Sequence, residues 1–180
     1  MAVSIVLKVS HFSQYSSSGF AAVNRILEST RGSDEIGLDI ADGDLHILPE
    51  SITCTALTKL CVSGPTSMDT MLGFIQRLPN LAKLIVHKLV LDSAQSDLSI
   101  PDASNHTPLE PLDTRLSMLA INYDGNQHSP DTAVAVAKYM LLKVPTLTEF
   151  HTAQTPQQPV VDFVATFAQW YPHLSNDWIK

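Results

Sequence analysis

The chain has 180 residues, of which 44% are hydrophobic and 16% charged, and its formal net charge is −7. This composition is typical of a folded protein rather than a disordered one. Only 11 Lys and Arg residues stand against 18 Asp and Glu, which offers no basic surface for nucleic acid or an anionic membrane. We therefore expect neither a nucleic-acid partner nor a membrane partner.

The sequence carries no sign of export or of a membrane span. No apolar run approaches the roughly 20 residues that a span needs, and the first 20 residues lack the basic start of a signal peptide. A disulfide between the two cysteines, Cys54 and Cys61, would close a very small loop. Two thiols of this kind are typical of buried side chains in a reducing compartment. We expect a cytoplasmic or nuclear protein.

The first third of the chain predicts irregular strand–helix units over residues 1–53. Residues 3–9, VSIVLKV, predict a strand, and residues 17–30, SSGFAAVNRILEST, predict a helix capped by Ser17 or Ser18. Alternating apolar residues over 36–40 predict a second strand.

The stretch DIADGDLH, residues 39–46, is the most polar cluster. Asp39, Asp42, Asp44 and His46 offer oxygen and nitrogen atoms that a metal ion could use. The spacing of a calcium-binding helix–loop–helix is absent, and Asp42-Gly43 is a turn signal in its own right. A polar turn is the interpretation that the spacing favours, and a metal or active site at this turn is the alternative.

From residue 54 a short phrase of the form L-x-x-L-x-V recurs. Its leading leucines are Leu57, Leu81, Leu116 and Leu147, spaced by 24, 35 and 31 residues. The second apolar positions are Leu60, Leu84, Leu119 and Phe150. Alternation within each phrase predicts a strand of about five residues with one buried face.

Helical patterns fill the intervals between these phrases. One begins at Thr66 or Ser67, a second follows Ser129-Pro130, and a third covers residues 160–171. A proline ends each pattern, because the residue before a proline is pushed out of the helical conformation. The clearer repeats therefore cover 54–91 and 112–174, and the Ser-, Asp- and Pro-rich stretch 92–111 predicts a loop insertion.

These phrases resemble the leucine-rich repeat, in its ribonuclease-inhibitor-like and F-box-associated forms. The resemblance implies an α/β fold, a solenoid of strand–loop–helix units forming a single repeat domain over 1–180. A parallel sheet would line its concave face and helices the other. The family's asparagine after the ladder is replaced here by Pro65, Leu89, Asp124 and Thr155. Partners of such proteins usually dock on the concave sheet.

We therefore predict a non-catalytic protein–protein interaction module without cofactor or metal, which could be the substrate-recognition part of a larger adaptor. Alternation assigns the candidate partner-binding residues to the outward side of the strands. They are Lys59, Lys83, Ile85, His87, Met118, Asn122, Glu149 and His151. The alternative is a small α/β enzyme or metal-binding domain with its site at the 39–46 turn.

Overall fold

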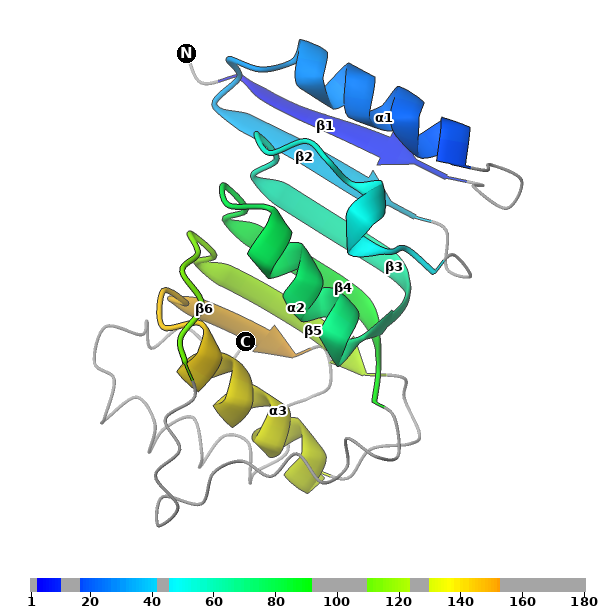
Figure 1. The fold of residues 1–180 in the computed structure, drawn as a ribbon. Coiled ribbons are helices and arrows are strands. Elements are labelled where there is room, and N and C mark those ends of the chain that lie inside the picture. The colour runs from blue at the N-terminus through cyan, green and yellow to red at the C-terminus, as the bar shows by residue number, and fades with distance from the viewer. Residues whose placement is uncertain (1–2, 11–16, 42–45, 92–109, 124–129, 153–180) are drawn as a thin grey trace.

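The computed structural model describes residues 3–10, 17–41, 46–91, 110–123 and 130–152 (Figure 1). Strands and helices alternate along most of this length. The elements are β1 (Ser4–Val9), α1 (Ser17–Ser29), β2 (Glu35–Ile40), the 3-10 helix η1 (Pro49–Ser51), β3 (Lys59–Ser67), α2 (Met68–Arg77), β4 (Lys83–Val90), β5 (Met118–Tyr123), α3 (Pro130–Lys143) and β6 (Glu149–Thr152). No helix in these ranges is long and apolar enough to cross a bilayer.

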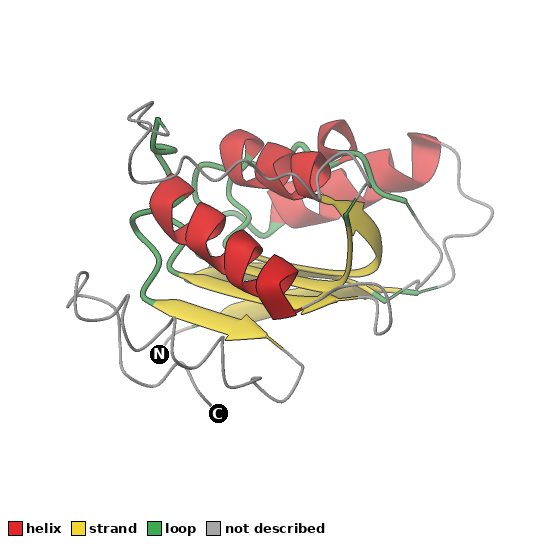
Figure 2. Ribbon diagram, turned by 90° about the horizontal axis from the view of Figure 1, so that it is seen from below, coloured by secondary structure: helices red, strands yellow, loops and turns green. Residues whose placement is uncertain are grey.

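The strands form one six-stranded sheet whose spatial order is the order of the sequence, and every pair of neighbours is parallel (Figure 1). Figure 2 shows that the helices of the described residues, α1, η1, α2 and α3, lie on one side of this sheet. The predicted α/β class with a parallel sheet is confirmed. The strand order never reverses, so the described sheet lacks the switch point at which doubly wound α/β enzymes bind their ligands. We call the sheet surface opposite the helices the open face.

The strand register confirms the alignment predicted from the recurring phrase. Leu60, Leu84, Leu119 and Phe150 are successive partners across β3 to β6, and each is at most 3% exposed. A second row of β-branched side chains, Ile40, Val62, Val86 and Ile121, runs parallel to the first. Both rows point toward the helices, so the hydrophobic core lies between the sheet and the helix layer.

Helix α2 shows how the local sequence sets the packing. Ser67 caps the helix, since its hydroxyl accepts a hydrogen bond from the Thr70 amide at 3.2 Å. The buried stripe includes Phe74, which the sequence pattern did not single out. Gly73 allows α2 to approach η1 closely, because a Cβ there would lie 2.6 Å from Pro49 Cγ.

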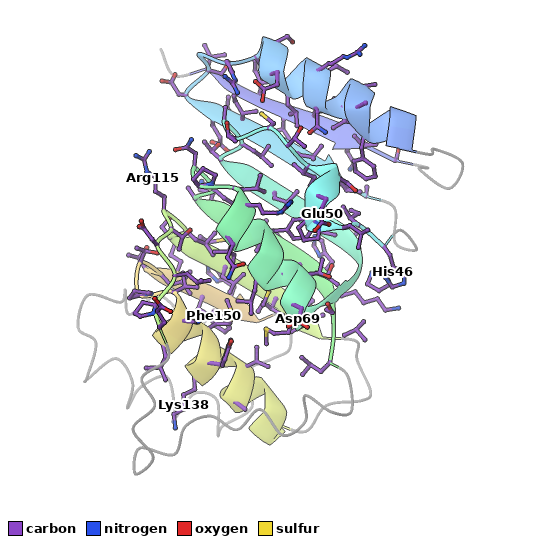
Figure 3. All side chains as sticks on the ribbon, viewed as in Figure 1. His46, Glu50, Asp69, Arg115, Lys138 and Phe150 are labelled. Carbon is purple, nitrogen blue, oxygen red and sulfur yellow. The ribbon has the colours of Figure 1, made fainter. Side chains whose placement is uncertain are left out.

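The turns that precede the strands are tied to one another by hydrogen bonds at equivalent positions. The amides of Ala82, Ser117 and Thr148 donate to the carbonyl of the corresponding residue one unit earlier, at 2.8–2.9 Å. Asn80 Nδ2 donates to the Thr55 carbonyl at 2.9 Å, and Arg115, labelled in Figure 3, donates to Asn80 Oδ1 at 3.1 Å. These bonds connect neighbouring units at the turns that precede the strands.

Two strands are much longer than the expected length of about five residues. β3 has nine residues and β4 has eight. Pro65, which the sequence pattern placed after the strand, lies within β3 opposite Lys88, beyond a register shift that follows Val62. An irregularity of this kind accommodates a proline that cannot donate to the ladder. Residues 92–109 of the predicted insertion 92–111 lie outside the described residues, as does the predicted helix over 160–171.

Candidate functional site

The open face is organised in three rows that run across the strands. The first row contains Val6, Gly37, Lys59, Lys83, Met118 and Glu149. The second row contains Lys8, Asp39, Cys61, Ile85, Ala120 and His151. Alternation along β3, β4 and β5 places Ser63, His87 and Asn122 beyond them. The structure therefore brings all the predicted partner-binding residues to one face of the sheet.

Charged side chains at the two flanks of the open face have partners on the protein itself. Lys8 Nζ lies 4.0 Å from the Asp39 carboxylate across β1 and β2. His151 Nε2 lies 3.5 Å from Glu149 Oε2 along β6. These pairs are solvent-exposed, so each contributes little to stability, at most about 1 kcal/mol. Both contacts lie at the flanks and do not involve the centre of the face.

The centre of the open face combines two lysines with apolar side chains. Lys59 and Lys83 are direct register partners on neighbouring strands, and within the described ranges no acidic side chain forms a salt bridge with either. Like charges placed opposite each other on a sheet destabilise it slightly. Ile85 and Met118, both partly exposed, adjoin these lysines. The centre thus offers positive charge and apolar surface side by side.

A chain of polar contacts crosses β3, β4 and β5 near this centre. Cys61 Sγ lies 3.3 Å from His87 Nε2, and Asn122 Nδ2 lies 3.3 Å from His87 Nδ1. Cysteine, histidine and asparagine in this order form the catalytic groups of some thiol proteases. With Asn122 donating through Nδ2, His87 Nδ1 accepts, and Nε2–H is directed toward the sulfur. In that tautomer His87 cannot accept a proton from the thiol.

The electrostatics of Cys61 oppose a nucleophilic role. Burial, together with the negative charge of Asp39, raises the pKa of the Cys61 thiol to about 11. The thiolate is the nucleophilic form of cysteine, and thiol enzymes lower this pKa with nearby positive charge. Here the contact network holds the His87 ring in place across the sheet. We interpret it as a positioning network within the open face.

We expect the rate of alkylation of Cys61 to be low at pH 7. The rate should still be rising with pH at pH 10, without reaching a plateau. The raised pKa keeps the thiol protonated until the pH nears 11, so its thiolate fraction at pH 7 is on the order of 100-fold below that of an ordinary cysteine. Residue-resolved mass spectrometry of iodoacetamide labelling against pH measures this midpoint. Asp39→Asn should move the midpoint to lower pH. A midpoint near or below pH 7 in the unmodified protein would contradict this description of the thiol.

The 39–46 turn is only partly described. Asp39 lies on β2 and takes part in the open face, and His46 is exposed after the segment 42–45, which lies outside the described residues. Within the described ranges, no three His, Cys, Asp or Glu side chains are grouped so as to hold a metal ion. The metal or active site at this turn stays a prediction.

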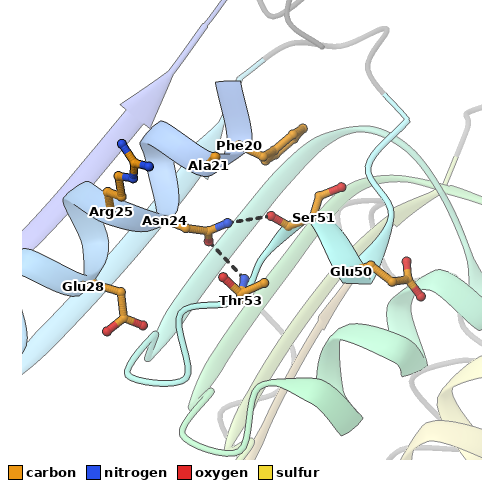
Figure 4. A pocket seen from close by; sticks show the side chains of 8 residues that line it. All are labelled: Phe20, Ala21, Asn24, Arg25, Glu28, Glu50, Ser51 and Thr53. Carbon is orange, nitrogen blue, oxygen red and sulfur yellow. Dashed lines mark hydrogen bonds between the residues drawn. The ribbon is translucent and has the colours of Figure 1, made fainter. Parts of the chain in front are cut away.

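A groove of about 680 Å³ lies on the helix side, between α1 and η1 (Figure 4). Asn24 crosses it, donating through Nδ2 to the Ser51 carbonyl at 2.9 Å and accepting through Oδ1 from the Thr53 amide at 3.0 Å. Both the nitrogen and the oxygen of the Asn24 side-chain amide therefore already form hydrogen bonds within the protein. Arg25, Glu28 and Glu50 complete the lining without converging on a common point (Figure 4). The groove separates two successive units.

Comparisons of the chain with protein-family models, curated proteins and solved structures gave no match. The functional argument therefore rests on the open face itself. The sequence pattern placed His87 and Asn122 on the outward side of the strands but did not reveal their contacts with each other and with Cys61. These residues are 26 and 35 positions apart, and only the strand register brings them together.

Proposed function

We propose that the protein is a leucine-rich-repeat-like solenoid that binds another protein on its open face. The strictly sequential parallel strands support the solenoid, as do the one-sided helices and the equivalent hydrogen bonds between successive turns. In such an array each unit buries its apolar side against its neighbours. The sheet side that carries none of the described helices is then the continuous surface available to a partner.

One observation carries the proposal: Lys59 and Lys83 stand side by side next to Ile85 and Met118. Maintaining two adjacent positive charges is unfavourable for the isolated sheet, and a carboxylate from a partner would remove that cost. An apolar centre beside these charges, with charged pairs at the flanks, is the layout of a protein-binding surface. The favoured partner is a protein segment that combines acidic and apolar side chains.

The buried cysteines and the acidic composition support a cytoplasmic or nuclear setting. Binding without catalysis is favoured over a thiol enzyme because the pKa of Cys61 is raised to about 11. By the resemblance to leucine-rich repeats, the bound protein would be the substrate of a larger adaptor assembly.

Affinity capture from native lysate, with the wild type beside a Lys83→Glu/His87→Glu/Glu149→Lys variant, tests the proposed function. All three positions lie on strands of the open face, and none belongs to the hydrophobic core, so the variant should keep the wild-type melting temperature. We expect a protein that the wild type retains and the variant loses. Identical captured proteins from both baits would remove the support for an open-face partner.

A further inference from the structure

The outer edge of β1 presents backbone groups that no described strand pairs with. The amides of Asp34 and Glu35 donate to the Val3 carbonyl, and the Ala41 amide donates to the Val9 carbonyl. Because backbone groups alternate in direction along a strand, the odd-numbered residues of β1 bond to β2. The N–H and C=O groups of Ser4, Val6 and Lys8 therefore point away from the sheet, and no described strand lies beyond them.

Exposed apolar side chains gather at this same edge. Of the four large hydrophobic residues that stand exposed in the described ranges, Val3 and Val6 lie at β1 and Ile26 lies on α1, each about half exposed. Helix α1 runs beside β1 (Figure 1). The core is also incompletely covered here. Leu7 is only partly buried, whereas its register partner Leu38 is 1% exposed. An edge strand with unpaired backbone groups and exposed apolar side chains is a template for pairing with another strand.

We propose that a second copy of this chain covers the edge, through antiparallel pairing of β1 with β1 about a twofold axis at Val6. In an antiparallel pair, two residues directly opposite each other point their side chains to the same face of the sheet. They either exchange both backbone hydrogen bonds with each other or exchange none. Setting Val6 opposite Val6 satisfies both conditions and opposes Ser4 to Lys8. All the outward N–H and C=O groups of Ser4, Val6 and Lys8 are then used. The twofold axis is perpendicular to the sheet, so both helix layers lie on the same side.

The side chains fit this register better than the next permitted one. Val6 meets Val6 on the open face, and Ile5 meets Leu7 on the core face, so apolar residues oppose apolar residues. Lys8, which often guards a strand edge against pairing, meets Ser4 of the second copy, whose own register partner is Glu35. Shifting the axis to Leu7 would instead set Lys8 against Val6. Charge and apolar surface therefore both favour the axis at Val6.

Analytical ultracentrifugation of the 180-residue chain, from micromolar to submillimolar concentration, tests this proposal. The wild type should approach twice the 19.7 kDa chain mass. Val6→Lys places two ammonium groups at the axis and should return the mass to 19.7 kDa. Leu48→Lys changes the fourth exposed hydrophobic residue, which is 62% exposed and far along the chain from β1, and should leave the dimer intact.

A second variant keeps the test independent of any loss of folding in Val6→Lys. The Cα atoms of opposed Val6 residues would be about 5.5 Å apart, within the range that a disulfide spans. The Val6→Cys protein should form a reducible dimer at least about tenfold faster than the Leu48→Cys protein, because pairing raises the local thiol concentration. Equal rates, a monomeric wild type at every concentration, or a Val6→Lys protein that is folded and still dimeric would overturn the proposal.

Discussion

Replacing Leu84 with alanine is expected to lower the free energy of unfolding by about 2–5 kcal/mol. Leu84 is 0% exposed and lies in the middle of the row that joins Leu60 to Leu119. Removing its side chain takes apolar atoms out of the core and leaves a cavity that two neighbouring strands cannot close without losing their register. Urea unfolding followed by circular dichroism measures the change.

Ile85→Ala is the matched control, since it shortens the adjacent residue on the same strand. Ile85 points to the open face and is partly exposed, so we expect a loss of about 1 kcal/mol or less. The two substitutions remove a similar number of carbon atoms and differ mainly in the face from which they remove them. Equal losses would show that the two sides of β4 have been assigned wrongly.

Lys83→Glu is expected to weaken binding of the captured partner by at least about tenfold, which corresponds to about 1.4 kcal/mol. The substitution removes one of two adjacent positive charges and places a negative charge where the proposed partner presents carboxylates. Lys83 is exposed and outside the core, so its replacement should change stability by no more than about 0.5 kcal/mol. Titration calorimetry and thermal melting measure the two effects separately.

Lys138→Glu provides the control for net charge. It makes the same change on α3, which lies on the helix side of the sheet (Figures 2 and 3). Binding should be nearly unchanged if the open face is the docking surface. A comparable loss from both variants would show that overall charge, rather than the Lys59–Lys83 pair, controls the affinity.

The strands and the buried side of each could be predicted because one physical pattern determines both. Alternation in L-x-x-L-x-V predicts a strand with one apolar side. Leu60, Leu84 and Leu119 occupy the same position in their phrases, which predicts the register that the structure confirms. Helix α2 could also be predicted from the sequence, because Ser67 provides a local capping signal. These features depend on residues close together in the sequence.

Features that depend on neighbouring units could not be predicted from the pattern. The extension of β3 past Pro65 requires Lys88 and Leu89 on the adjacent strand, and proline argues against a strand by local criteria. Likewise, the Cys61–His87–Asn122 contacts require three strands in register. The raised pKa of Cys61 depends on burial and on Asp39 from another strand. Each of these is a property of the assembled sheet.

Hydroxyl-radical footprinting of the protein, free and bound to the captured partner, tests the docking surface most directly. Binding at the open face predicts that oxidation of Met118, Ile85 and His87 falls on complex formation, while that of Leu48 and Tyr139 on the helix side does not change. All of these side chains have solvent exposure in the free protein, so protection can be read at each. Protection confined to Leu48 and Tyr139, with Met118 and Ile85 oxidised as before, would contradict the open face as the site of binding.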